Sequence, residues 1–252
     1  MKPVRAILFD FGHTLVDFRR TEEALHAAYR QILVRIEAVA YIEVPELLDL
    51  VERVAGGIDR LVAQSYAERR MEEIDLVATF KETLSTVGFD LPEDVIEHVV
   101  ALDHSAYSNS ITVEPEVLAA LGSLEEAGYT LGLVSNVALL PQRMRADIDA
   151  LGIGRHLKAS VFSSEVGVRK PDPRIFSEAL SRLGTDPAET VFVGDRLYDD
   201  VSGAQAVGMR AVLTRQFRAE EDPQFRPDAV IDHLGDLGAV LPRWGGPTPR
   251  EG

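Results

Sequence analysis

The 252-residue chain contains no cysteine. Disulfide bonds, thiolate metal ligands and thiol nucleophiles are therefore excluded. No apolar run approaches the ~18 residues that a membrane-spanning helix needs. The N-terminal stretch MKPVRAILFDFG leads into an acidic strand end, which is not the pattern of a cleavable signal peptide. We therefore expect a soluble, cytoplasmic protein with no membrane partner.

Basic residues are scarce relative to acidic ones. There are 26 Lys and Arg residues against 41 Asp and Glu residues, which gives a formal net charge of −15. This charge would repel a phosphate backbone, so we expect no nucleic-acid partner. A small anionic substrate stays possible, because a pocket can be positive on a negative protein. The hydrophobic fraction of 46% is enough for one large domain, or for a core with an insert.

Apolar runs alternate with helical segments of about a dozen residues after residue 111. The runs lie at 129–134, 159–162, 190–193, 210–213 and 229–231. This alternation is typical of βαβ units and predicts an α/β fold with a parallel sheet. The continuous apolar run Val4–Phe9 resembles a strand buried on both faces, so we assign it to the same sheet.

Residues 17–111 have a different pattern, with apolar stripes at helical spacing and no convincing strand. They predict four amphipathic helices that form a small bundle. The resulting division places a core in residues 1–16 and 112–240 and a helical insert in 17–111. The Pro- and Gly-rich stretch 241–252 is predicted to be a flexible tail.

Polar residues follow several of the predicted strands. They are Asp10, the pair Ser135 and Asn136, Lys170, and the acidic residues Asp195 and Asp200. Ligands of open parallel sheets bind beyond the carboxyl ends of the strands, so we expect these residues to meet at one edge. Each of them alone would be an ordinary cap, turn or loop residue. Their combination in this order is what indicates a site.

Asp10 has the chemistry of a nucleophile. An aspartate that attacks phosphorus forms an aspartyl-phosphate, which splits a difficult hydrolysis into two easier steps. A carboxylate and a phosphate repel each other, so such a site needs a cation. Mg²⁺ is held by one or two carboxylates with substrate oxygens, and Asp195 and Asp200 would complete that set.

The other polar residues would bind the phosphate. Lys170 would offset the remaining negative charge, and the Ser135 hydroxyl would donate to a phosphate oxygen. Backbone N–H groups of Phe11 and Gly12 and of the segment at Asn136 could cradle the other oxygens.

These motifs resemble those of the haloacid dehalogenase-like hydrolases. DFGHTL, LVSN, RKPDPRIF and VFVGDRLYDDVSGAQAVGM look like the family's four motifs in order. The helical insert resembles the alpha-helical cap of the subclass that includes phosphoglycolate phosphatase-like and dehalogenase-like members. The resemblance implies a Rossmann-like, doubly wound core with a mobile helical cap. It also implies Asp10 as the nucleophile, with Mg²⁺ bound by Asp10, Asp195 and the carbonyl of Gly12 and supported by Asp200.

The chain departs from the family pattern at Gly12. The first motif is usually written DxDGT, and its second aspartate protonates the leaving group and then activates water. Gly12 has no side chain for either task, and loss of a general acid/base typically costs about 10²–10⁴-fold in rate. His13 is the candidate substitute, because imidazole titrates near neutral pH.

Four functions stay open. We favour a Mg²⁺-dependent hydrolase of small phosphomonoesters, acting on a phosphorylated metabolite as a monomer or homodimer. A metal-independent 2-haloacid dehalogenase would need no acid at position 12, but the acidic segment 195–200 favours a metal. A phosphonate-cleaving relative would need a cap lysine, and the insert contains only Lys81. A non-catalytic phospho-ligand-binding or regulatory protein would not need Asp10.

Overall fold

A computed structural model describes residues 2–40 and 45–247 of the chain. The chain divides into two compact units. An α/β unit comprises residues 1–17, 112–137 and 141–252, and a helical unit comprises residues 18–111 and 138–140. These bounds lie close to those of the predicted core and insert.

A parallel sheet of six strands forms the centre of the α/β unit, in the order β5-β4-β1-β6-β7-β8. The strands are β1 (Ala6–Phe9), β4 (Thr130–Ser135), β5 (Ala159–Phe162), β6 (Thr190–Gly194), β7 (Arg210–Thr214) and β8 (Ala229–Ile231). The first strand therefore lies between β4 and β6, which follow it much later in the sequence. The predicted α/β fold with a parallel sheet is confirmed.

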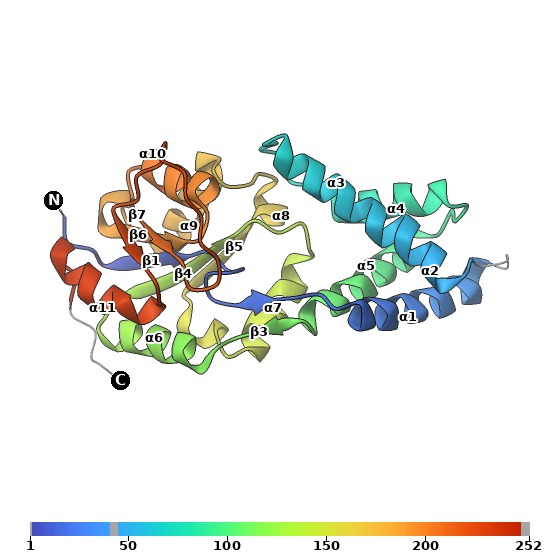
Figure 1. The fold of residues 1–252 in the computed structure, drawn as a ribbon, viewed down its shortest axis with the longest axis horizontal. Coiled ribbons are helices and arrows are strands. Elements are labelled where there is room, and N and C mark those ends of the chain that lie inside the picture. Colours follow the sequence, from blue (N-terminus) through green and yellow to red (C-terminus); the bar gives the residue numbers. More distant parts are fainter. Residues whose placement is uncertain (1, 41–44, 248–252) are drawn as a thin grey trace. The chain divides into compact units, whose positions relative to one another are not determined.

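Helices cover both faces of this sheet, which explains why its central strands are apolar throughout. Figure 1 shows α9 and α10 on one face and α6 and α11 on the other. The helices are α6 (Pro115–Glu126), α7 (Pro141–Ala150), α8 (Ser163–Val166), α9 (Pro173–Leu183), α10 (Gly203–Ala206) and α11 (Leu237–Val240). Single turns of 3₁₀-helix lie at Gly154–His156, Pro187–Glu189 and Leu234–Asp236. All four residues of β1 are buried, as a strand covered on both faces requires.

The helix α9 illustrates how the sequence sets its own ends. Asp172 is its N-cap and accepts a hydrogen bond from the backbone N–H of Arg174 at 2.9 Å. Pro173 occupies the first turn, where a missing N–H is tolerated. Gly184 ends the helix at φ 67°, a left-handed conformation that favours glycine.

The predicted flexible tail is wrong for its first residues. Leu241–Trp244 form a 3₁₀-helix, and Leu241 is fully buried. The Trp244 carbonyl accepts a hydrogen bond from the backbone N–H of Val4 at 3.3 Å. Composition alone pointed to a loose segment, because Pro and Gly follow directly and conceal the apolar residues that continue α11 into the core. Residues 248–252 lie outside the described part of the chain.

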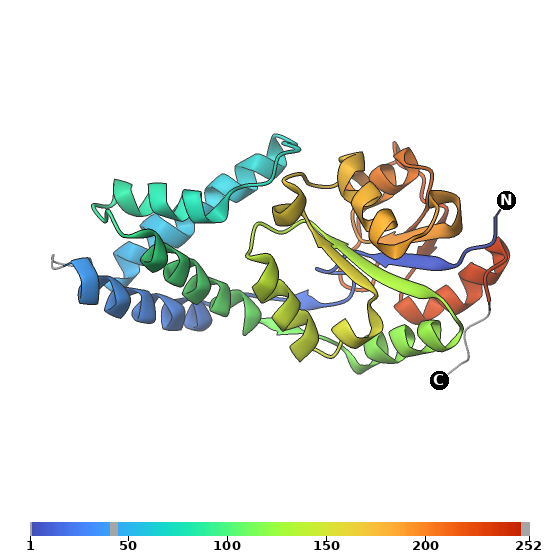
Figure 2. The ribbon, with the colours of Figure 1, turned by 180° about the vertical axis from the view of Figure 1, so that it is seen from behind.

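The helical unit has its own apolar core, and Figure 2 shows its helices packed along one another. The helices are α1 (Glu22–Ala40), α2 (Leu47–Leu50), α3 (Gly56–Ala67), α4 (Leu76–Thr86) and α5 (Glu93–Ser108), with a π-helical turn at Val51–Ala55 joining α2 and α3. The side chains of Ile32, Phe80 and Val99 are fully buried in this core. Among the described residues, no helix is both long enough and apolar enough to cross a membrane.

Two short strands mark where the chain passes from one unit to the other. They are β2 (Asp17–Phe18) and β3 (Ile111–Thr112), which pair with each other as a two-stranded sheet. The Thr112 hydroxyl donates to the Asp17 carbonyl at 3.4 Å. The sequence pattern did not reveal these strands, because two residues are too few for an alternating pattern to emerge.

Candidate active site

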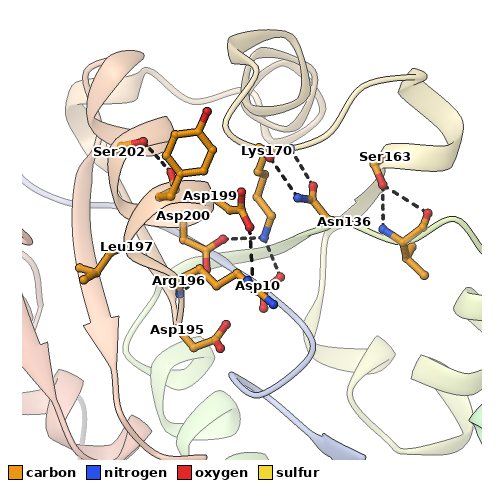
Figure 3. Close-up of polar contacts among 12 residues, drawn as sticks. Asp10, Asn136, Ser163, Lys170, Asp195, Arg196, Leu197, Asp199, Asp200 and Ser202 are labelled. Carbon is orange, nitrogen blue, oxygen red and sulfur yellow. Dashed lines mark hydrogen bonds and ion pairs between the residues drawn. The ribbon is translucent and has the colours of Figure 1, made fainter. Parts of the chain in front are cut away.

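The predicted site residues meet at the carboxyl edge of the sheet. Asp10 follows β1, Ser135 ends β4, and Asp195 follows β6. These three strands are neighbours and run parallel, so their carboxyl ends lie side by side. Asp10 and Ser135 are only 8% and 5% exposed. Figure 3 shows Asp10 among Lys170, Asp195 and Asp200.

Lys170 joins two of the acids. Its Nζ lies 2.6 Å from Oδ1 of Asp10 and 2.7 Å from Oδ1 of Asp200. Burial disfavours the charged ammonium, but the two carboxylates outweigh this effect and raise the pKa of Lys170. The lysine therefore stays positively charged and holds the Asp10 side chain in one orientation.

The backbone of Lys170 is itself held in place by Asn136. The Lys170 N–H donates to Oδ1 of Asn136 at 2.7 Å, and Nδ2 of Asn136 donates to the Lys170 carbonyl at 3.1 Å. These paired contacts are drawn in Figure 3. They indicate that Asn136 positions Lys170, while its substrate contact stays a prediction.

Asp200 is fixed by the segment between Asp195 and α10. The backbone N–H of Arg196 donates to Oδ2 of Asp200 at 2.9 Å. Residues Leu197–Ser202 form a π-helical turn that leads directly into α10. A Cβ atom at Gly194 would overlap the Asp200 side chain. The residue before Asp195 must therefore be glycine if Asp200 is to lie close to Asp195.

The cluster carries more negative than positive charge. Burial, followed by the charges of Asp10 and Asp200, raises the pKa of Asp195 to about 7. Burial likewise raises the pKa of Asp10, with a contribution from the charge of Asp200. Burial also raises the pKa of Asp199, an acid in the same turn, to about 6. A cation would relieve this repulsion.

The donor set suits Mg²⁺. Asp10, Asp195 and Asp200 each offer a carboxylate oxygen, and these atoms lie within 4.8 Å of one another. All three residues are buried, and oxygen atoms of carboxylates are the ligands that Mg²⁺ prefers. The sequence prediction of these three acids as one cluster is therefore matched by their positions.

The turn after Asp10 contains the departure from the family motif. The Phe11 carbonyl accepts a hydrogen bond from the backbone N–H of Leu15 at 2.9 Å, and the His13 N–H donates to the Val16 carbonyl at 2.7 Å. A backbone hydrogen bond from Phe11 also favours the charged form of Asp10. Gly12 has no positive φ, whereas His13 has a φ of 58°.

The His13 side chain contacts an acid of its own turn. Its Nδ1 lies 3.3 Å from Oδ1 of Asp17, and its side chain is 28% exposed. Burial and the nearby charge of Arg218 lower the pKa of His13, against the opposing effect of Asp17. The imidazole is therefore mainly neutral at neutral pH, which suits a proton acceptor better than a proton donor.

An arginine that the sequence motifs do not contain also reaches the site. Nη2 of Arg218 donates a hydrogen bond to Oδ2 of Asp195. Arg218 lies in the loop 215–228 after β7, the strand beside β6. The rule that singled out Asp195 also applies to the carboxyl end of β7, and this is the signal that identifies Arg218.

A doubly wound parallel sheet that carries a buried aspartate, a lysine and a cluster of three acids at its carboxyl edge is an arrangement of α/β enzymes. A family model for haloacid dehalogenase-like hydrolases matches residues 4–208. The glyceraldehyde 3-phosphate phosphatase of Methanopyrus kandleri is 31% identical over 230 residues, which cover 91% of each chain. The chain belongs to the haloacid dehalogenase-like hydrolases, as the motifs predicted.

Solved structures of both a phosphatase and a dehalogenase resemble this chain. A HAD phosphatase from Thermococcus onnurineus is 26% identical with a TM-score of 0.61, covering 97% of this chain and 100% of that one. A 2-haloacid dehalogenase from Pseudomonas syringae is 27% identical with a TM-score of 0.69, covering 96% and 99%. The comparison therefore shows the fold and the hydrolase family, while the reaction has to be argued from the site.

Proposed function

We propose that the protein is a Mg²⁺-dependent phosphatase of small phosphorylated metabolites that works through an aspartyl-phosphate on Asp10. The observation that carries this proposal is the cluster of Asp10, Asp195 and Asp200 with one lysine between them. The phosphatase named among the relatives supports it.

Different residues of the chain have different roles in phosphoryl transfer. Asp10 attacks phosphorus with a carboxylate oxygen, and Lys170 keeps that carboxylate oriented and offsets its charge. The Ser135 hydroxyl and the Phe11 and Gly12 N–H groups donate hydrogen bonds to the phosphoryl oxygens. Asn136 acts through Lys170, whose backbone it holds.

Bound Mg²⁺, held by Asp10, Asp195 and the Gly12 carbonyl with support from Asp200, would neutralise charge on the phosphoryl group. The raised pKa of Asp195 fits this role, because a cation would stabilise the carboxylate that burial disfavours. Arg218 and Lys170 supply two positive charges to the cluster, and neither replaces a divalent ion between the three acids.

His13 takes over the activation of water, the second of the two tasks that Gly12 cannot perform. It lies three residues after Asp10, and Asp17 contacts its Nδ1 and so orients the ring. In the second step, a water molecule attacks the phosphorus of the aspartyl-phosphate and gives its proton to the imidazole. The P–O bond to Asp10 breaks, and the electron pair returns to the carboxylate.

A 2-haloacid dehalogenase is the rival reaction, and the structural similarity to such an enzyme together with Gly12 favours it. A departing halide needs neither a proton nor a divalent cation. Three clustered, buried carboxylates, of which Lys170 contacts two, would then be an unnecessary cost, because burying like charges is unfavourable. The acid cluster therefore favours the phosphatase.

A substrate panel tests the proposal. We expect phosphate release from phosphorylated compounds with Mg²⁺, loss of this release with a chelator, and no halide release from 2-haloacids. Asp10→Asn should lower turnover by at least roughly 10³-fold, because it removes the nucleophile. Asp186→Asn is the matched control, since Asp186 is an exposed acid that pairs with Lys2. Metal-independent halide release would contradict the proposal.

A further inference from the structure

The site combines a positively charged guanidinium, that of Arg218, with the absence of an acidic side chain at Gly12. Gly12 has no side chain and so no proton to donate. A guanidinium does not give up its proton, but it offers five N–H donors in a planar fork that matches carboxylate and phosphate oxygens. Arg218 can therefore stabilise an anion in a site that has no aspartic acid at position 12 to protonate one.

The loop holds Arg218 beside Asp195. On one side of it, the Leu234 N–H donates to Oε1 of Gln216 at 3.1 Å. On the other side, the Leu197 N–H donates to Oε2 of Glu220 at 2.5 Å. The loop is thus tied to the α/β unit on both sides of Arg218, one tie being to the turn that carries Asp199 and Asp200.

The Arg218 side chain extends from the buried acid toward solvent. It is 34% exposed, whereas the Asp195 side chain is 2% exposed. Arg218 donates to Asp195 through Nη2, so other N–H groups of the fork can meet a ligand. Its charge also reaches the imidazole of His13, which lies in the turn after the nucleophile.

We propose that the substrates, given the proposed phosphatase function, are phosphoryl compounds whose leaving group departs as an oxyanion, and that Arg218 binds this leaving oxyanion. Phosphoanhydrides and acyl phosphates share this chemistry. Arg218 is thereby a specificity-determining residue of the site.

The step balances without a proton donor. An oxygen of the Asp10 carboxylate forms a bond to the terminal phosphorus, and the bond from phosphorus to the bridging oxygen breaks. The electron pair of that bond stays on the bridging oxygen, which departs as phosphate or carboxylate beside the guanidinium. Water then cleaves the aspartyl-phosphate as described above.

Leaving-group basicity explains the preference. A phosphate group has a second pKa of about 6, so it leaves as an anion without help at neutral pH. An alcohol is a far weaker acid than phosphate, so the departure of an alkoxide from an alkyl phosphate depends on an acid. The absence of the acid at Gly12 therefore penalises alkyl esters far more than anhydrides.

The experiment compares kcat/KM of the full-length enzyme with Mg²⁺ for three compounds: pyrophosphate, acetyl phosphate and ethyl phosphate. We expect at least one of the first two to exceed ethyl phosphate at least tenfold. Arg218→Ala should lower kcat/KM for that preferred compound at least tenfold, and Arg218→Lys, which keeps the charge but not the fork, should lower it less. Arg226→Ala, an exposed arginine of the same loop, is the control and should change it less than twofold.

Binding gives a second readout that needs no turnover. Calorimetry with methylenediphosphonate, a non-hydrolysable mimic of pyrophosphate, should show at least tenfold weaker binding by Arg218→Ala when pyrophosphate is the preferred substrate. A larger effect of Arg218→Ala on pyrophosphate assigns the leaving group to phosphate, and a larger effect on acetyl phosphate assigns it to carboxylate; either result supports the proposal.

Two results overturn the inference while leaving the phosphatase intact. One is a wild-type kcat/KM for ethyl phosphate within threefold of both other compounds. The other is an effect of Arg218→Ala no larger than that of Arg226→Ala. The phosphatase itself fails under a different result, in which no phosphoryl compound is hydrolysed or Asp10→Asn retains full activity.

Discussion

His13 has a backbone conformation that most residues avoid. Its φ of 58° is left-handed, which costs a non-glycine residue roughly 1–2 kcal/mol. The family motif has glycine at this position, so the chain accepts a strained histidine where a glycine would serve the backbone better. Strain of this kind at a site points to a role for the side chain.

A pH profile tests that role. His13 accepts a proton from water in the second step, which contributes to kcat and not to kcat/KM. We therefore expect kcat to rise with pH as the imidazole loses its proton, and its lowered pKa places this rise below the ordinary value of 6.5. His13→Ala should flatten this limb and lower the plateau by roughly 10²-fold. An unchanged profile would show that His13 takes no part in proton transfer.

His13→Gly separates catalysis from strain. Glycine adopts the left-handed conformation without penalty, so this variant should have a higher Tm than His13→Ala, by an amount that corresponds to about 1 kcal/mol. Its activity should be as low as that of the alanine variant, because both lack the imidazole. Recovery of activity in His13→Gly would mean that backbone shape, and not the side chain, matters here.

Gly12 allows the converse experiment. Gly12→Asp adds the missing acid at a position without positive φ, so the backbone can accept the side chain. We expect kcat/KM for an alkyl phosphate such as ethyl phosphate to rise by roughly 10²-fold, since a general acid contributes about this much. The same rate or a lower one, in a variant that still binds Mg²⁺, would count against the account of Gly12.

At the scale of elements, the long regular segments were predicted well. The strand 159–162 has the predicted bounds, because a continuous apolar run is a strong local signal. The helix Pro173–Leu183 likewise has Asp, Pro and Gly at its ends, which are strong local signals of where a helix begins and ends. The π-helical turn at Leu197–Ser202 was missed, since its shape depends on the contact of Asp200 with Lys170 and not on local preference. Similarly, the 3₁₀-helix Leu241–Trp244 depends on the burial of Leu241 in the α/β unit.

The helical unit contains a half-buried acid that makes its stability pH-dependent. Burial raises the pKa of Asp103 in α5 to about 6, although the charge of Arg20 opposes this shift. The folded chain therefore binds a proton more tightly than the unfolded chain, and stability falls as the pH rises from about 4 toward 6. Near neutral pH the charged side chain destabilises the fold.

Asp103→Asn removes this charge and tests the effect. We expect a higher Tm at pH 7.5, corresponding to a gain on the order of 1 kcal/mol, and a much smaller difference at pH 4. Thermal unfolding followed by circular dichroism measures both. Asp94→Asn, an exposed acid at the beginning of the same helix, is the control and should show no such pH-dependent gain. An equal Tm for Asp103→Asn and the wild type at both pH values would contradict the assignment.

At the scale of the whole molecule, strand order assembles the site. Asp10 and Asp195 are far apart in sequence, but β1 and β6 are paired neighbours, so their carboxyl ends coincide. The sequence could predict this meeting, because the rule for parallel sheets needs only the strand ends. It could not predict that Arg218 would contact Asp195, since that depends on the course of an irregular loop.

Trapping the intermediate tests the central claim most directly. The enzyme with Mg²⁺ and a turned-over phosphoryl substrate is quenched in acid, digested and analysed by mass spectrometry. The account predicts one phosphoryl group on the peptide that contains Asp10, and none in Asp10→Asn. Phosphate release by the wild type with no adduct on Asp10, or with an adduct on another residue, would contradict it.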